Sequence, residues 1–275
     1  LKELEVDHLD AVICSHPDED HCGGLSAVLA STRTDAFYCS VDSWHTKVFS
    51  DVTKYVAEQG ISVTIPQAGD TFAFSDASVE FLGPVVDYGD DPNEGSLVAR
   101  VRYGETSFLF TGDMGFEAED DMLAAGVDVS ATVLKVAHHG SAGSSSTEFL
   151  QAVHPQYAVI SVGADNDYGH PTEAALNRLS ACGIPVYRTD LLGEIIAVSD
   201  GKTVTITSAS NEAPPASDAA SQTAGSYGYV GNSSSKVVHL ASCGKLPGES
   251  NRVYFASLDE ALAAGYRKHA NCLGN

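Results

Sequence analysis

Two imidazoles and two carboxylates fall within six consecutive positions near the start of the sequence: His16, Asp18, Asp20 and His21. Imidazole nitrogens and carboxylate oxygens are common ligands of divalent metal ions in proteins. The apolar run 9–14 precedes these residues and the apolar run 25–30 follows them, which predicts a loop between a buried strand and a helix. A polar loop that only caps the helix, with Asp20 as N-cap and both histidines solvated, explains the same residues equally well.

Three later strands end in the same kinds of residue. The second strand of a predicted hairpin, 97–103 with 106–110, ends at Thr111-Gly112-Asp113. The short buried strand 133–137 ends at His138-His139, and the strand 157–162 opens into a loop that ends at His170. Because the carboxyl ends of strands can meet at one edge of a sheet, the sequence favours a metal centre over a polar loop.

Four motifs, taken in order over residues 9–207, carry a resemblance to a known family. They are His-x-Asp-x-Asp-His-x-Gly-Gly, Thr-Gly-Asp, Leu-Lys-Val-x-His-His-Gly-Ser and Tyr-Gly-His-Pro. Together they resemble the metallo-β-lactamase-fold hydrolases, specifically the branch typified by the hydrolase domain of the competence protein ComEC/Rec2. The resemblance implies the α/β class, as an αββα sandwich with a two-metal site at the edge between its sheets.

The same resemblance implies a metal-dependent phosphodiesterase or nuclease that acts on DNA, expected to be single-stranded DNA at the bacterial cell surface. Two alternatives stay open: a hydrolase of the same fold that acts on a small ester, lactone or β-lactam, and a non-catalytic metal-containing binding module. The expected cofactors are two divalent ions, Mn²⁺ or Zn²⁺. Two such ions clamp a phosphodiester and activate a water for in-line attack on phosphorus.

The residues expected at the site follow from these motifs. The metal ligands are His16, Asp18, Asp20, His21, Asp113 and one of the pair His138 and His139. Asp113 is the expected bridge, and His139 is preferred of the pair because it is nearer the Gly140 turn. Asp20 and His170 are the candidate catalytic residues, with His170 holding the phosphate or donating a proton to the leaving oxygen.

Three residues near the histidine pair are candidate substrate contacts. Ser141 and Ser144 can bind a phosphate oxygen, although ordinary loop hydrogen bonds explain serines there equally well. Lys135 lies inside a predicted strand, where a structural ion pair is the alternative to a phosphate contact.

The sequence departs from the family pattern in three places. Better-known members carry a second histidine where this chain has Asp18, and residues 93–98 offer no imidazole where a third-motif histidine is usual. One metal position is therefore expected to be oxygen-rich, which favours Mn²⁺ or Mg²⁺ over Zn²⁺ there. The strand pair that usually precedes the histidine loop is absent, so we expect either a piece of a longer protein or a first sheet short of strands.

Composition limits the remaining possibilities. The chain has 275 residues, 43% of them hydrophobic, enough for one large domain and an appendage. No apolar run approaches the roughly 20 residues of a membrane span. The formal net charge of −22 argues against a broad basic surface for duplex nucleic acid. It leaves a nuclease possible, because bound divalent cations reverse the local field.

The hydrolase domain is expected over residues 1–207, with strands and helices that alternate in each half. An acidic mobile loop is expected at 87–94. The expected helices are 25–31, 50–59, 116–125, 145–153 and 172–180. The further expected strands are 37–41, 61–65, 79–84 and a hairpin of 194–198 with 203–207.

A linker and a small module follow. Residues 208–226 are rich in Ala, Ser and Pro without apolar periodicity, which predicts a flexible linker. Residues 227–275 carry a possible ligand set: His239, Cys243, His269 and Cys272. The module resembles the Ada-like metal-binding domain found with extracellular nucleases, with His269 where a cysteine is usual, and this implies a structural Zn²⁺ in a small α+β domain. A Cys243–Cys272 disulfide is the alternative.

Overall fold

The computed structural model describes residues 1, 4–209, 229–240, 243, 245–248, 251–255 and 258–273. The chain divides into two compact units: Leu1–Val129 with Ser199–Thr203, and Ser130–Val198 with Val204–Asn275. The predicted linker lies outside the described residues from residue 210 onward. The predicted division at residues 207 and 226 therefore stays a prediction.

The first unit contains thirteen of the described elements. In chain order they are β1 (His8–Leu9), β2 (Val12–Cys14), α1 (Glu19–Cys22), α2 (Leu25–Ser31), β3 (Arg33–Thr34), β4 (Phe37–Cys39), α3 (Lys47–Glu58), β5 (Val63–Thr64), β6 (Thr71–Phe74), β7 (Ala77–Gly83), β8 (Val98–Tyr103), β9 (Thr106–Phe110) and α4 (Phe116–Ala124).

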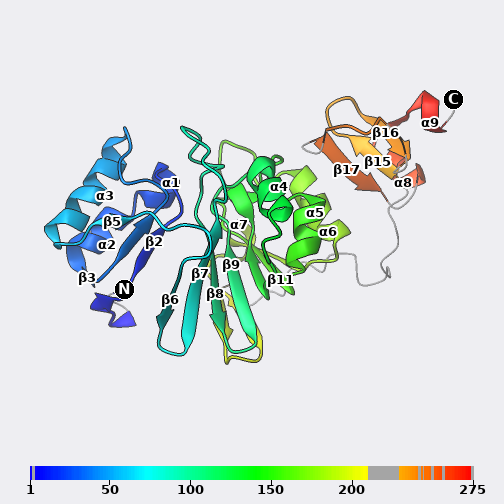
Figure 1. Cartoon of the computed structure of the whole chain (residues 1–275). Helices are drawn as coiled ribbons and strands as arrows, with labels where there is room; N and C mark the ends of the chain where they lie inside the picture. Colours follow the sequence, from blue (N-terminus) through cyan, green and yellow to red (C-terminus); the bar gives the residue numbers. More distant parts are fainter. Residues whose placement is uncertain are drawn as a thin grey trace. The chain divides into compact units, whose positions relative to one another are not determined.

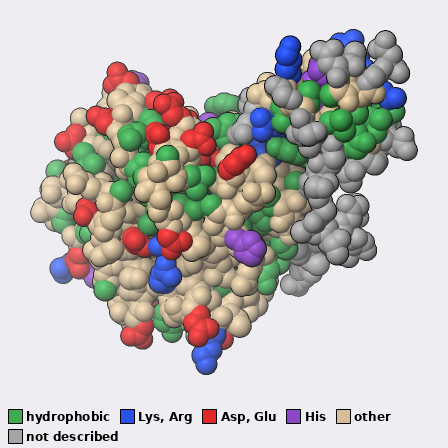
Figure 2. All heavy atoms as spheres, turned by 45° about the vertical axis from the view of Figure 1, so that its right-hand side comes forward, with side chains coloured by type: hydrophobic (Ala, Val, Ile, Leu, Met, Phe, Trp, Pro, Cys, Tyr) green, Lys and Arg blue, Asp and Glu red, His purple; other side chains and the backbone are tan. Residues whose placement is uncertain are grey.

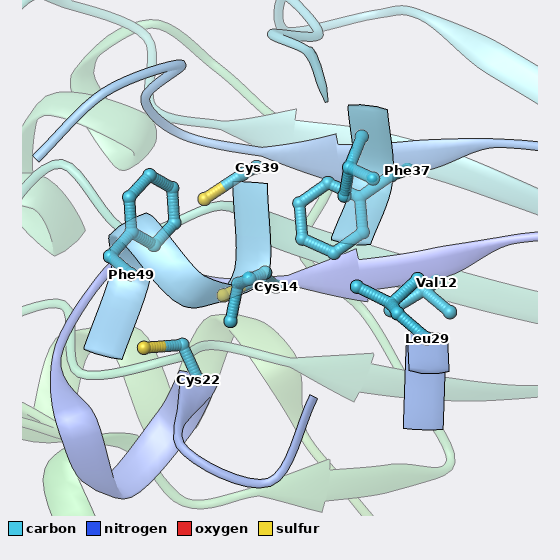
Figure 3. Close-up of a cluster of buried hydrophobic side chains, with 9 residues drawn as sticks. Val12, Cys14, Cys22, Leu29, Phe37, Cys39 and Phe49 are labelled. Atoms are coloured by element: carbon cyan, nitrogen blue, oxygen red, sulfur yellow. The ribbon is translucent and has the colours of Figure 1, made fainter. Parts of the chain in front are cut away.

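A three-stranded parallel sheet, in the order β2-β4-β5, has helices α2 and α3 on one face (Figure 1). Alternate residues of each strand point to opposite faces, so Val12 and Cys14 face the helices while Ile13 faces away. Figure 3 shows the resulting core, in which the three thiols of this unit lie among aliphatic and aromatic side chains. None of these thiols forms a disulfide.

An antiparallel sheet, β6-β7-β8-β9, packs against the other face of the parallel sheet. Tyr38 of β4 stacks on Phe72 of β6 with ring centroids 5.1 Å apart, and Ile13 joins the same cluster. On the far face of the antiparallel sheet, Met122 of α4 lies against Gly83 of β7, where an added Cβ would meet its sulfur at 3.1 Å. The layer order is therefore helix, sheet, sheet, helix, which confirms the expected αββα arrangement.

The second unit begins with a parallel sheet, β10-β11-β12, and ends with the C-terminal module. Its elements up to residue 208 are β10 (Val133–Lys135), a 3₁₀ turn (Ala137–Gly140), α5 (Thr147–Val153), β11 (Tyr157–Ile160), α6 (Glu173–Ala181), β12 (Val186–Arg188), α7 (Thr189–Leu192), β13 (Ile195–Ser199) and β14 (Val204–Ser208). β13 and β14 form the predicted hairpin.

The C-terminal module is a small α+β structure. Its sheet has the order β17-β15-β16-β18. Among its described residues, one buried cluster contains Val238, Val253, Phe255, Ala261 and Tyr266. The elements are β15 (Tyr229–Asn232), β16 (Val237–Leu240), β17 (Arg252–Phe255), α8 (Leu258–Ala263), β18 (Arg267–Lys268) and α9 (Ala270–Leu273). Because residues 227–275 are few, the module can bury only a limited apolar core, and we expect a further source of stability.

The structure differs from the sequence-based expectation in a few elements. Part of the predicted histidine loop is the helical turn α1, with Asp18 as its N-cap, and the N-cap of α2 is Gly24 rather than Asp20. Helix α3 begins three residues earlier than predicted, because the Thr46 hydroxyl caps it by accepting the N–H of Phe49. Strand β6 was not predicted. Among the described helices, none has the length and apolar character needed to cross a membrane.

Candidate metal centres

The histidine loop connects β2 to α1, and two buried thiols form hydrogen bonds to its backbone carbonyl groups. The Cys14 thiol donates to the carbonyl of His16 at 3.1 Å, and the Cys22 thiol donates to the carbonyl of Pro17 at 3.2 Å. Burial raises the pKa of Cys22 to about 11, so this thiol stays protonated and able to donate. The backbone that carries His16 is thus held by the core of the parallel sheet.

The two imidazoles of this loop present the same edge to serine hydroxyls. The ring centroids of His16 and His21 are 4.1 Å apart. Ser15 Oγ lies 3.1 Å from Nδ1 of His16 and 3.4 Å from Nδ1 of His21, and Ser96 Oγ lies 3.2 Å from Nδ1 of His16. A histidine that binds metal through Nε2 usually donates Nδ1–H to a hydrogen-bond acceptor, and a serine hydroxyl can serve as that acceptor.

The opposite edge of each ring faces carboxylates. His21 Nε2 lies 3.1 Å from Asp113 Oδ1 and 3.6 Å from Asp20 Oδ2, and His16 Nε2 lies 3.9 Å from Asp18 Oδ2. Two ligand atoms each about 2.1 Å from one ion are at most about 4.2 Å apart, so all three distances suit shared ions. Within this unit, ligand atoms of Asp20, His21 and Asp113 lie within 4.8 Å of one another.

Asp113 reaches these residues from the antiparallel sheet, directly after β9. Its side chain is buried, and its backbone N–H donates to Ser96 Oγ at 3.1 Å. Gly112 adopts φ +53°, and a Cβ there would lie 2.7 Å from Ser96 and 2.9 Å from the Ser15 side chain. The glycine of the Thr-Gly-Asp motif therefore lets the chain turn where a side chain would not fit. The ligands of this unit come from two stacked sheets, as the family resemblance implied, and not from one sheet edge, as the strand ends alone indicated.

The acidic segment 87–94, predicted as a mobile loop, forms hydrogen bonds to helix α4 and to its N-cap residue. Tyr88 donates its hydroxyl to Asp121 at 2.8 Å, and burial raises the pKa of that tyrosine. Glu94 Oε2 accepts the backbone N–H groups of Gly115 and Ala118 at 3.1 and 2.8 Å. Glu94 thereby caps α4, whose N-cap position is a glycine without a side chain. Sequence reasoning missed Glu94 and Ser96, because a cap supplied from another segment has no local signature.

In the second unit, the histidine pair lies in a strained turn after β10. His138 and His139 have φ of 48° and 54°, a left-handed conformation that is uncommon for non-glycine residues. His139 Nδ1 lies 2.7 Å from the carbonyl oxygen of Ser161. Because a carbonyl only accepts, Nδ1 carries the proton and Nε2 is left as the ligand atom. The preference for His139 over His138 as the ligand stays a prediction.

His170 lies beside the same pair. Its ring is edge-on to His138, with centroids 5.7 Å apart, and Tyr168 stacks on it at 6.0 Å. Asn166 holds the backbone of His170, accepting its N–H at 2.9 Å and donating to its carbonyl at 2.7 Å. Tyr168 is 84% exposed, so this imidazole is bordered by an open aromatic face.

The predicted substrate contacts sit in the loop after the histidine pair. Ser144 is fully buried and donates to the carbonyl of Ala137, which favours the loop-forming role that the sequence left open. Ser141 Oγ is partly exposed and accepts the N–H of Gly143 at 3.3 Å. Lys135 Nζ donates to the neighbouring carbonyl of Val136 at 2.9 Å.

A residue that the sequence analysis missed organises this loop. Arg178 of α6 is buried and donates to the carbonyls of Ser144, Ser145 and Ala142 at 2.6, 2.8 and 3.1 Å. An arginine on the otherwise apolar face of a predicted helix was the available signal. It fixes the backbone that follows His139.

The C-terminal module brings its four predicted ligands together. Ligand atoms of His239, Cys243, His269 and Cys272 lie within 4.8 Å of one another, and both cysteines are free thiols. His269 Nδ1 is 3.8 Å from Cys243 Sγ and 3.2 Å from Cys272 Sγ. Nitrogen and sulfur ligands of one tetrahedral zinc are roughly 3.6 Å apart, so this cluster can hold a metal ion. Burial, then the nearby His269, lowers the pKa of His239 and keeps it neutral, as a ligand must be.

The chain is similar in sequence to known proteins over more than two thirds of its length. The chain is 37% identical over 196 residues to "Competence protein ComA" of Neisseria gonorrhoeae, covering 71% of this chain and 26% of that protein. It is 32% identical over 190 residues to "ComE operon protein 3" of Bacillus subtilis (strain 168), covering 69% and 24%. The chain thus spans about a quarter of the length of the curated relatives it matches.

Among solved structures, CmlA, a diiron β-hydroxylase from Streptomyces venezuelae, matches with a TM-score of 0.46 and 16% identity, over 66% of this chain and 44% of that one. The profile of the metallo-beta-lactamase superfamily matches residues 1–164, which is more than half of the chain. This match covers the histidine loop, Asp113 and the histidine pair. The chain belongs to the metallo-beta-lactamase superfamily.

Proposed function

We propose that this chain is a metal-dependent phosphodiesterase or nuclease that acts on DNA. The observation that carries the proposal is the oxygen-rich donor set around His21, where Asp20 and Asp113 both approach Nε2. Carboxylate-rich sites suit Mn²⁺, the type of ion that commonly serves phosphoryl transfer. His16 and Asp18 are proposed to supply further ligands, with Asp113 as the bridge. His139 stays the ligand that the sequence predicts from the histidine pair.

When bound, the two ions supply an activated water and neutralise charge that develops on the phosphate. The residues of the chain orient the ligand atoms and are proposed to act on the leaving group. His16 and His21 are oriented by hydroxyls at Nδ1, so their Nε2 edges stay directed at the carboxylates. His170, whose backbone Asn166 holds on both sides, is proposed to donate a proton to the leaving oxygen or to bind the phosphate.

A polynucleotide substrate is supported by two further features. Tyr168, exposed beside His170, offers a face on which an unstacked base can lie. The C-terminal residues 227–275 hold five of the fifteen Lys and Arg residues and only three of the thirty-seven Asp and Glu residues. In Figure 2 the blue side chains of this module contrast with the red ones over the rest of the visible face. Both features suit single-stranded DNA.

The names of the relatives bear on the substrate and on the location of the protein. One of them is named a competence protein, which supports DNA as the substrate and the bacterial cell surface as the location. The cysteine and histidine cluster is proposed to be a structural Zn²⁺ site in an Ada-like module, with the ion adding the stability that its small core lacks.

The experiment is a metal and substrate screen on purified protein. We expect hydrolysis of single-stranded DNA and of bis-p-nitrophenyl phosphate with Mn²⁺, and none in a chelator. Duplex DNA and a small lactone and β-lactam complete the panel. Turnover of the lactone or β-lactam without turnover of the phosphodiester would replace this proposal with the small-molecule hydrolase. Metal binding without any turnover would favour the binding module.

A further inference from the structure

Ser96 links two segments that carry the proposed ligands. Its side chain is fully buried, with Oγ 3.2 Å from Nδ1 of His16 and 3.1 Å from the backbone nitrogen of Asp113. The next residue, Leu97, donates its N–H to the carbonyl of Ser15 at 2.8 Å. One hydroxyl thus touches the histidine loop, which follows the parallel sheet, and the turn of Asp113, which follows the antiparallel sheet.

The direction of one of these hydrogen bonds is fixed, and the direction of the other depends on the tautomer of His16. The Asp113 N–H can only donate, so it uses one lone pair of Ser96 Oγ. A serine oxygen has a second lone pair, which can accept a hydrogen bond from Nδ1–H of His16. A histidine with its proton on Nδ1 leaves Nε2 bare, and the Nε2 of His16 is the atom that faces Asp18.

The backbone leaves room for this serine and for little more. A Cβ on Gly112 would lie 2.7 Å from both Cβ and Oγ of Ser96. The glycine therefore permits the close approach that brings the Asp113 N–H to the hydroxyl. Ser96 also lies in the segment 93–98, which has no histidine for the site.

We propose that Ser96 is a positioning residue for the metal centre, which fixes the tautomer of His16 and the backbone of Asp113 together. This inference rests on the proposed function, because the tautomer of His16 affects the site only if Nε2 of His16 binds a metal. In place of a third-motif imidazole, the chain has a hydroxyl that orients two other ligands. Supports of this kind typically change metal affinity by about 10- to 100-fold.

The variant Ser96→Ala, made in the full chain, tests the proposal. The NMR and hydrogen-exchange measurements are made without metal. We expect ¹⁵N NMR of the His16 ring to show the proton on Nδ1 in the wild type and a smaller Nδ1-protonated fraction in the variant. Amide hydrogen exchange at Asp113 should become faster. A calorimetric titration with Mn²⁺ alone should show that the variant binds Mn²⁺ about 10- to 100-fold more weakly than the wild type.

Two matched variants separate the contributions. Ser15→Ala removes the other hydroxyl at Nδ1 of His16, so it should shift the tautomer but leave exchange at Asp113 unchanged. Ser107→Ala removes a buried serine hydroxyl of β9 and should change none of the three readouts. If Ser96→Ala fails to fold by circular dichroism, Ser96→Cys, with a weaker acceptor of similar size, is measured instead and should show the same shifts.

Two results overturn the proposal: a wild-type His16 with its proton on Nε2, or a folded Ser96 variant with unchanged tautomer and unchanged Mn²⁺ affinity. Failure of the proposed function looks different. In that case the wild type hydrolyses no phosphodiester while the tautomer and the exchange at Asp113 still depend on Ser96.

Discussion

The carboxylate of Glu94 accepts the backbone N–H of Ala118 at 2.8 Å and so caps a helix that begins three residues after Asp113. Burial raises the pKa of Glu94 above its ordinary 4.5, and the two N–H groups oppose that shift without cancelling it. The segment that carries Ser96 and the helix that follows Asp113 are therefore joined through a carboxyl group that resists ionisation.

This cap gives the first prediction, a pH dependence of stability. A pKa raised in the folded state means that the stabilising contribution is present below the unfolded value and is lost as pH rises through the folded pKa. The free energy of unfolding of the wild type, minus that of Glu94→Gln, should therefore fall as pH rises above 4.5. Urea unfolding of both proteins at a series of pH values measures it. A difference that is constant with pH would contradict the assigned cause.

Asp113→Ala should remove bound metal and nearly all hydrolysis while the fold survives, because the side chain supplies metal bonds and little apolar packing. Metal content by mass spectrometry and phosphodiester turnover are the readouts. Asp90→Ala, in the exposed acidic loop, is the control and should behave as wild type. Wild-type turnover in Asp113→Ala would place the site elsewhere.

His170→Ala should keep its metal and lose turnover by roughly 10²-fold or more, as expected for a residue that acts on the transition state. Metal content and kcat on bis-p-nitrophenyl phosphate are measured side by side. His45→Ala, an exposed histidine next to Trp44, serves as the matched control. Loss of metal in His170→Ala would make His170 a ligand instead.

The ligand set of the C-terminal module predicts that the zinc content of the chain depends on which residue replaces His269. His269→Cys should retain Zn²⁺, since a thiolate is an equally good tetrahedral ligand, whereas His269→Ala should bind it much more weakly. Zinc content per chain after dialysis against a weak chelator is the measurement. Equal zinc content in His269→Ala and the wild type would remove His269 from the site.

Removal of the residues after Ala209 should leave turnover of a small phosphodiester unchanged, because every residue proposed for catalysis precedes that point. Turnover of single-stranded DNA should fall if the basic module helps to hold the polymer. Steady-state rates on bis-p-nitrophenyl phosphate and on an oligonucleotide distinguish the two effects. A large loss on the small substrate would show that the two-domain division is wrong.

The sequence by itself determined the family, the order of most elements and the residue types of both metal sites. These are local properties: donors within six positions, strands of alternating or continuous apolar residues, and glycine at a turn such as Gly112. Their spacing along the chain carries the information, so no structure is needed to find them.

Only the tertiary structure decided how the donors are held. Glu94 caps a helix more than twenty positions further along the chain, Ser96 bonds His16 at a separation of eighty residues, and Arg178 fixes a loop more than thirty residues before it. Such contacts form when two stacked sheets or a sheet and a helix bring distant segments together. A sequence read along its length contains no signal for them, because the hydrogen-bonding partner of a buried polar group is set by packing.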